Sequence, residues 1–448
     1  MNKQNENDDR SVNSVVQKSL RPFWVLWSGQ AISLFGSQIV QFALIWWLTQ
    51  ETGSATILAV ASLVGLLPQV ILGPFVGVLV DRWSRRWTMF IADVVIATAS
   101  IGLAYLFWAG SIEIWHVFAL LFIRALGGAF HWPAMQASTS LMVPEEKLTQ
   151  IQGLNQMLQG GLNIISAPLG AILVGALTMP MLLGIDVVTA LFAIVPLLFI
   201  LVPQPEKAAV SDPTKAEERP SYWQELRSGL RYVWSWKGLL MIMLMAALIN
   251  FMLTPAASLM PLLVTKHFQG GAMQLALMES ALGVGVVAGG ILLSVWGGFN
   301  RRIYTTLVGL LGLGASMALL GFIPADLYFV AVAAAFVSGA MMSLTNGPIM
   351  AIMQSAVDPA MQGRVFTLLS SVAMAMSPLS LIVAGPLADA FGVTTWFAIG
   401  GSVTVVIGLT GFVNKAVLSV EDGRSGGKSD TIVAEEFDRP MIDTAVAD

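Results

Sequence analysis

Apolar residues dominate the chain in long runs that shorter polar and charged segments interrupt. A helix needs about 20 apolar residues to cross the hydrocarbon core of a bilayer. Prolines and glycines inside such runs are compatible with membrane helices, because neighbouring helices can satisfy the backbone groups that they free. The pattern predicts twelve membrane-spanning helices, over residues 22–48, 57–80, 88–109, 114–143, 151–178, 181–202, 238–264, 273–296, 303–323, 327–357, 365–388 and 393–418.

The basic residues predict the direction of these helices. Lys and Arg accumulate in the cytoplasmic segments of membrane proteins. With both termini placed in the cytoplasm, every Lys and Arg except Lys266 and Arg124 falls in a cytoplasmic segment. We therefore expect both termini inside the cell.

The predicted helices fall into two similar halves. A near-constant offset of 213 to 216 residues relates Asp81 to Ser294, Arg85 to Arg301 and Arg86 to Arg302. The fold class we expect is an all-α integral membrane protein with two parallel six-helix repeats. Its parts are a cytoplasmic N-terminal tail at 1–21, an N-terminal half at 22–202, a cytoplasmic linker with an amphipathic helix at 203–237, a C-terminal half at 238–418 and an acidic, disordered tail at 419–448.

Composition excludes several classes of protein. The chain is 56% hydrophobic and only 11% charged, whereas a soluble domain carries roughly a quarter of charged residues. Its net charge of -4 makes nucleic acid an unexpected partner. The absence of cysteine excludes disulfides and thiolate metal sites, and no metal site is expected. Common nucleotide-binding, zinc-protease and serine-nucleophile motifs are missing too, so we expect neither an enzyme nor an ATP-driven pump.

Arg124 lies near the middle of the fourth predicted span. An arginine at that depth costs about 2.5–3.5 kcal/mol even on the lenient insertion scale, so it needs an inward-facing partner or an anionic substrate. His131 follows seven residues later on the same helical face, and Trp132 lies away from the membrane interfaces where tryptophan usually gathers. A role in function is favoured for Arg124, whereas His131 is equally consistent with a buried structural histidine.

Two acidic residues lie inside predicted spans. Asp186 and Glu279 are each five or six residues from the outer end of a span, on the order of 8–9 Å deep. Carboxyl groups within membrane segments commonly relay protons, which makes both residues candidates for proton coupling. Alternatively, they are hydrated or pair with Lys266. The polar side chains predicted to line a cavity, or to bond between helices, are Gln30, Gln41, Asn250 and Asn346.

The segment 77–86 reads GVLVDRWSRR and resembles the signature of the major facilitator superfamily between its second and third helices. The resemblance implies a close-packing glycine, an aspartate that faces a helix N-terminus of the other half, and arginines that bind acidic groups. An aspartate near a helix N-terminus is favoured by about 0.3–1 kcal/mol. Ser84 departs from the family pattern, and the arginines could instead only enforce topology. The conformational switch implied in this way comprises Gly77, Asp81, Arg82, Arg85, Arg86, Asp93 and Arg364.

Asp93 lies inside the third predicted span, seven residues after Arg86 and on a similar helical face. We expect it to pair with a loop arginine. A structural ion pair is favoured there over a role in transport.

Further stretches resemble the macrolide-efflux proteins of Gram-positive bacteria. They are WSGQAIS at 27–33, ETGSA at 51–55, ILGP at 71–74, FIR at 122–124, AFH at 129–131 and VPEE at 143–146. The resemblance covers about residues 22–418 and includes a helix-4 motif, RALGG at 124–128, whose arginine is implicated in proton transfer. It implies a multi-pass protein of the bacterial plasma membrane that exports an amphipathic, drug-like molecule of the macrolide type by proton antiport.

The partners implied by this resemblance are a small organic substrate, protons and the lipid bilayer. No cofactor is expected, because a proton gradient supplies the energy. Whether an ATP-binding-cassette resistance protein is a further partner is not readable from the residues. A sodium-coupled carrier, an exporter of siderophores or small peptides, a non-transporting receptor and a membrane-embedded enzyme are the alternatives.

Overall fold

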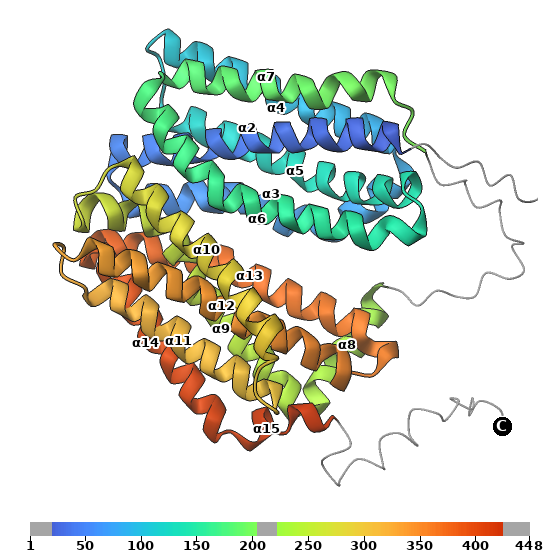
Figure 1. Cartoon of the computed structure of the whole chain (residues 1–448), viewed down its shortest axis with the longest axis vertical. Helices are drawn as coiled ribbons and strands as arrows, with labels where there is room; N and C mark the ends of the chain where they lie inside the picture. Colours follow the sequence, from blue (N-terminus) through green and yellow to red (C-terminus); the bar gives the residue numbers. More distant parts are fainter. Residues whose placement is uncertain (1–19, 204–221, 424–448) are drawn as a thin grey trace, which may run out of the picture.

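The computed structural model describes residues 20–203 and 222–423. Within these ranges all the regular secondary structure is helical (Figure 1). The N-terminal half contains α2 (Arg21–Thr52), α3 (Ala55–Arg82), α4 (Arg85–Trp108), α5 (Ile114–Met142), α6 (Glu145–Ala176) and α7 (Met179–Phe199). The C-terminal half contains α9 (Lys237–Leu262), η2 (Leu263–His267), α10 (Ala272–Trp296), α11 (Arg302–Phe322), α12 (Tyr328–Ala356), α13 (Pro359–Phe391) and α14 (Val393–Val413), with α8 (Tyr222–Ser235) before it and α15 (Lys415–Leu418) and η3 (Val420–Asp422) after it.

Twelve of the described helices are long and apolar enough to cross a membrane, so the predicted all-α membrane fold is confirmed. The prolines lie inside helices as expected, for example Pro168 in α6 and Pro378 in α13. The predicted last span, 393–418, is instead α14 followed by the separate turn of α15. The predicted N-terminal tail, most of the linker and most of the C-terminal tail lie outside the described residues, and the side of the membrane on which the termini lie stays a prediction.

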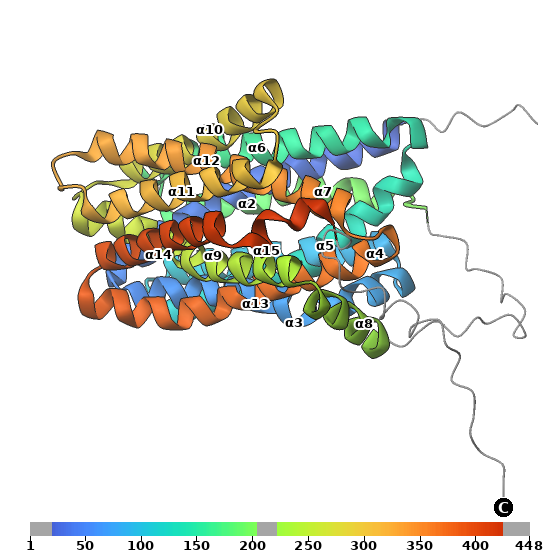
Figure 2. The same cartoon turned by 90° about the horizontal axis from the view of Figure 1, so that it is seen from below.

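The two halves lie side by side (Figures 1 and 2). In Figure 1 the helices of the C-terminal half run obliquely to those of the N-terminal half, so the halves meet at one end and diverge towards the other. We call the end of the bundle where α2, α4 and α11 begin, at Arg21, Arg85 and Arg302, the basic end. The opposite end, where α2 ends at Thr52 and α13 ends at Phe391, is the far end. The described chain both starts and stops at the basic end (Figure 1).

Small residues allow close helix packing within each half. A side chain at Gly29 of α2 would collide with the carbonyl of Phe192 in α7. In the C-terminal half, Gly285 of α10 lies against the backbone of α12 at Phe336, and Gly339 of α12 lies against the backbone of α10 at Leu282. In lipid, such close approaches supply the van der Waals contacts that hold helices together.

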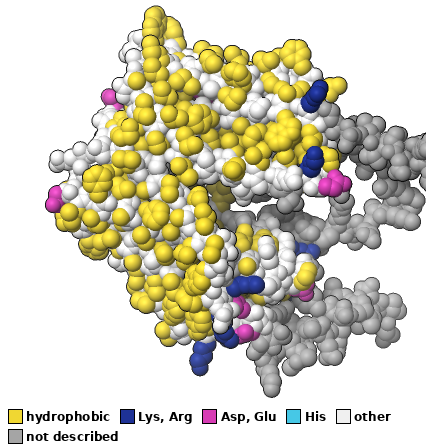
Figure 3. Space-filling view, viewed as in Figure 1, with side chains coloured by type: hydrophobic (Ala, Val, Ile, Leu, Met, Phe, Trp, Pro, Cys, Tyr) yellow, Lys and Arg dark blue, Asp and Glu magenta, His cyan; other side chains and the backbone are white. Residues whose placement is uncertain are grey.

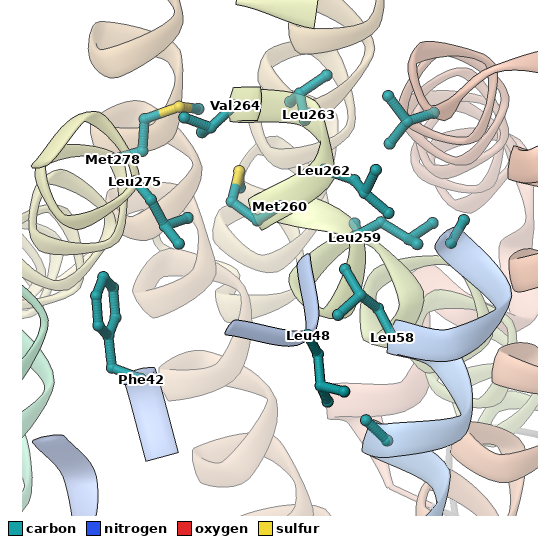
Figure 4. Close-up of a cluster of buried hydrophobic side chains, with 14 of the residues drawn as sticks. Phe42, Leu48, Leu58, Leu259, Met260, Leu262, Leu263, Val264, Leu275 and Met278 are labelled. Atoms are coloured by element: carbon teal, nitrogen blue, oxygen red, sulfur yellow. The ribbon is translucent and has the colours of Figure 1, made fainter. Parts of the chain in front are cut away.

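The main contacts between the halves are those of α3 with α13 and of α6 with α10. A buried apolar cluster joins the halves towards the far end, with Leu48 and Leu58 on one side and Leu259 and Met260 on the other (Figure 4). On the side of the basic end the surface is hollowed between the halves (Figure 3). The molecule is therefore closed at the far end and open towards the basic end.

Candidate functional site

The buried arginine of α5 has a partner in α7. Arg124 Nη1 lies 2.5 Å from Asp186 Oδ2, and the two side chains are 11% and 2% exposed. The carboxylate also accepts hydrogen bonds from Ser37 Oγ at 2.9 Å and Ser100 Oγ at 2.8 Å. Arg124 Nη2 donates to the carbonyl of Ser37 at 2.9 Å. The pair joins α2, α4, α5 and α7, and its extra hydrogen bonds offset part of the cost of removing two charges from water.

A second polar cluster lies among α2, α4 and α5. Gln30 Nε2 donates to Asp93 Oδ2 at 3.1 Å, and His131 Nε2 lies 3.5 Å from Asp93 Oδ1. The His131 nitrogen is buried without a hydrogen-bond partner in the described structure. The predicted pairing of Asp93 with a loop arginine is wrong, because the neighbours of its carboxylate are Gln30 and His131 instead.

The arginines that open α4 bind helix ends. Arg86 donates from Nε to the carbonyl of Leu197 and from Nη2 to that of Leu198, both at 2.5 Å, where α7 ends. Arg85 donates to the carbonyl of Ala137 at 2.7 Å. A cation at a helix C-terminus is favourable because it compensates carbonyl groups that have no partner within the helix. For Arg86 the expected binding of an acidic group is thus wrong.

Other residues of the predicted switch are described in part. Gly77, Asp81 and Arg82 belong to the last turns of α3, but their side chains lie outside the described part of the structure. Arg364 belongs to the first turns of α13, and its Nη1 lies 3.5 Å from the sulfur of Met361. The contact between Asp81 and the start of α13 stays a prediction.

A polar cavity of about 340 Å³ lies between the two halves. Residues of α2, α3 and α6 form one side, and residues of α9 and α10 form the other. Among the described residues that line it, Glu279 is the one charged side chain. The lining also contains Gln38, Gln41, Ser62, Asn163, Ser166 and Ser258, together with apolar residues such as Phe42, Ile45 and Leu275. Amide, hydroxyl and apolar groups around one carboxyl group suit an amphipathic organic molecule.

Glu279 is half-buried in this cavity. Its neighbour Ser280 donates to the carbonyl of Ile164 in α6 at 2.9 Å, across the contact between the halves. The hydroxyl of Ser166 is buried without a partner in the described structure. Glu279 and Ser166 both line the cavity, where a bound molecule would meet the carboxyl group of Glu279.

The cavity contains only some of the predicted polar residues. Gln41 and Glu279 line it. Within the described part of the chain, Trp132 is 43% exposed, Asn346 is exposed, and the amide of Asn250 donates to Ala246 one turn earlier in its own helix. Sequence reasoning missed Gln38, Ser62, Ser166 and Ser258. Gln38 could have been predicted, because it lies three residues before Gln41 and therefore on the same helical face.

Sequence reasoning also missed the residue that joins the halves at the far end. Asp389, near the end of α13, accepts hydrogen bonds from the backbone N–H groups of Ala55 at 2.7 Å and Thr56 at 2.9 Å. Ser54 Oγ donates to the same carboxylate at 2.9 Å. These groups form the N-terminus of α3, so a residue of one half caps a helix of the other half. The nearby Gly385 would meet Thr56 if it carried a side chain, which shows how closely the helices approach.

The protein has two six-helix halves with a polar cavity between them, and Glu279 is the single charged group among the described lining residues. This arrangement defines a carrier for small molecules. The model of the Major Facilitator Superfamily matches residues 26–381, and the chain belongs to this superfamily. It is 33% identical over 387 residues to macrolide efflux protein A of Streptococcus pyogenes, covering 86% of this chain and 94% of that protein. It is 32% identical over 329 residues to macrolide efflux protein A of Enterococcus faecalis, covering 73% of this chain and 100% of that protein.

Solved structures agree with this fold. The chain is similar to the crystal structure of a D-xylose-proton symporter with a TM-score of 0.65 at 15% identity, over 88% of this chain and 97% of that one. The protein is thus an efflux transporter of the superfamily that is similar to the macrolide-efflux proteins. It is a multi-pass protein of the bacterial plasma membrane and not an enzyme.

Proposed function

We propose that the protein exports an amphipathic, drug-like molecule of the macrolide type by proton antiport, through alternating access to the cavity between its halves. The names of its relatives support the substrate class. The observation that carries the proposal is the position of Glu279, a carboxyl group in the lining of a cavity that residues of both halves form. A carboxyl group that loses its proton to the cytoplasm can hold a substrate, and it releases the substrate when a proton returns from outside.

The ion pair within the N-terminal half has a supporting role in this proposal. Arg124 and Asp186 are already bonded to each other and to two serines. They fix α2, which lines the cavity, to α4, α5 and α7, so a change in this pair would alter the position of α2. His131 and Asp93 form a second close pair of ionisable groups in the same half.

The energy source is sufficient for such export. One charge that crosses a potential of 100 mV releases about 2.3 kcal/mol, which supports roughly a fifty-fold concentration ratio. The direction of transport requires the basic end to face the cytoplasm, as the distribution of Lys and Arg predicts. The open side of the structure then faces the cytoplasm, where the substrate is collected.

Uptake of radiolabelled macrolide into everted membrane vesicles tests the function. We expect accumulation when the vesicle interior is acidic, and none after an ionophore collapses the gradient or in vesicles without the protein. If no macrolide moves under any gradient, the substrate class is refuted and siderophores and small peptides become the next compounds to test. Accumulation that follows a sodium gradient instead would refute proton coupling and leave the substrate class intact.

Alternating access leads to a prediction at the far end. Replacing Asp389 with Ala removes the cap that closes the outer side, and loss of an N-terminal cap costs about 1 kcal/mol. The population open to the outside should rise by about fivefold. Because the sequence contains no cysteine, a single Ser258→Cys change places one thiol in the cavity, and a membrane-impermeant maleimide added to intact cells measures its exposure.

The matched control for this experiment is Asp326→Ala. Asp326 is an exposed acid in the connection between α11 and α12, also at the far end. The Asp326→Ala substitution should leave the rate at which the maleimide labels the Ser258→Cys thiol unchanged. Equal labelling rates in the Asp389→Ala variant and the parent would show that this contact does not hold the outer side closed.

A further inference from the structure

The short helix α8, which precedes the C-terminal half, has an unusual exposed face. Leu230 and Trp234 are 45% and 75% exposed, and Arg227 and Arg231 are exposed as well. Residues three, four and seven positions apart lie on one side of a helix, so these four side chains form a single surface. We call it the α8 face. Large apolar side chains interleaved with cations are characteristic of a binding surface rather than of a surface in bulk water.

The opposite side of α8 fixes the helix to the bundle. Val233 is 1% exposed and belongs to a buried cluster with Val365 and Leu368 of α13. Gly229 lies so close to α13 that an added side chain would meet Leu368. The helix cannot turn about its axis without losing these contacts, so the α8 face is held pointing away from the bundle.

The position of α8 places this face at a membrane surface. The helix lies at the basic end, beside α13 and at the edge of the bundle (Figures 1 and 2). It ends at Ser235, and the membrane-spanning α9 begins two residues later at Lys237. A side chain so close to the start of a span lies at the level of the lipid head groups, where the amphipathic ring of tryptophan is most stable.

The chemistry of the face selects one kind of partner. A guanidinium group binds phosphate through a planar fork of donors, and a basic cluster beside a membrane helix attracts anionic lipids. Leu230 and Trp234 supply apolar surface for the upper part of an acyl chain. We propose that the α8 face, Arg227, Leu230, Arg231 and Trp234, binds anionic phospholipids of the leaflet at the basic end.

Binding at this face has a mechanical consequence for the transporter. Because α8 packs on the first turns of α13, a lipid bound to α8 ties that end of α13 to the membrane surface. The other end of α13 carries Asp389, which closes the far side. The lipid site and the outer closure thus lie at opposite ends of one helix. This inference does not depend on the identity of the exported molecule.

The absence of cysteine from the sequence allows a direct test with the full-length protein. A Ser235→Cys variant, labelled with an environment-sensitive fluorophore, reports the surroundings of the α8 face, because Ser235 is exposed and bonds only to the carbonyl of Tyr232 in its own helix. The protein is reconstituted in nanodiscs of phosphatidylcholine, with or without phosphatidylglycerol. We expect a blue-shifted emission and quenching by lipid-borne spin labels when phosphatidylglycerol is present, and reversal by high salt.

Two variants give the result its specificity. Arg227→Gln combined with Arg231→Gln should weaken the response to phosphatidylglycerol by roughly tenfold or more. Arg301→Gln removes one positive charge from an exposed residue outside α8, at the basic end, and should leave the response intact. An unchanged thermal unfolding midpoint confirms that the double variant is folded. Equal quenching in phosphatidylcholine alone, or a fluorophore that stays in water in both lipids, would overturn the proposal.

Discussion

Replacing Glu279 with Gln should abolish gradient-driven accumulation of the substrate. One coupled proton supports roughly a fifty-fold concentration ratio at 100 mV, and without a group that exchanges the proton the ratio falls to about one. The change preserves the size of the side chain in the cavity, so binding of substrate and exchange across the membrane can persist. The measurement is uptake into everted vesicles with an acidic interior, compared with counterflow exchange in the absence of a gradient.

Glu51→Gln is the matched control, because Glu51 is an exposed glutamate at the far end of α2 and lies outside the described cavity. It should accumulate substrate as the parent does. Gradient-driven accumulation by the Glu279→Gln variant at the level of the parent would refute the assignment of proton coupling to this cavity, even if macrolide export itself were established.

Removing Asp186 should destabilise the protein more than any other single change considered for the site. The Asp186→Asn variant leaves the guanidinium group of Arg124 in the N-terminal half without its counter-charge. Breaking a buried ion pair by removing one partner costs about 3–5 kcal/mol. Unfolding of the purified protein in detergent, followed by tryptophan fluorescence, measures the difference in the free energy of unfolding.

A double-mutant cycle separates the ion pair from the packing around it. The Arg124→Met, Asp186→Leu variant carries no buried charge in this position, so it should be more stable than the Arg124→Met variant or the Asp186→Leu variant, which are the single variants of the cycle. If the costs of the two single changes simply add in the double variant, the two side chains do not interact and the role assigned to the pair is incorrect. Asp93→Asn is a useful comparison, since an amide can still accept the hydrogen bond from Gln30 and should cost less.

The sequence predicted the spans well because their length and apolar content depend on local composition. It also indicated that Arg124 needs a partner, since a lone charge in lipid is too costly. It could not name that partner, because Asp186 is 62 residues away and on a different helix. The π-helical turn at Leu263–His267 was missed for another reason: hydropathy does not distinguish one helical hydrogen-bond pattern from another.

The wrong and missed assignments have physical causes as well. Seven-residue spacing on a helix placed Arg86 near Asp93, but the long arginine side chain reaches the end of α7 instead. Asp389 lies just beyond a predicted span, where an acid is indistinguishable from a hydrated loop residue. Its partners are 333 to 335 residues away in the sequence, and only the packing of the two halves brings them together.

Both described clusters of buried charge, around Arg124 and around Asp93, lie wholly among α2, α4, α5 and α7. The cavity, in contrast, is lined largely by amide, hydroxyl and apolar side chains. Substitutions at its serines and glutamines change the shape of the pocket without disturbing the ionic framework. Under selection by a new antibiotic, adaptation should therefore accumulate first at those positions, and the framework should stay the same while the range of exported compounds diverges.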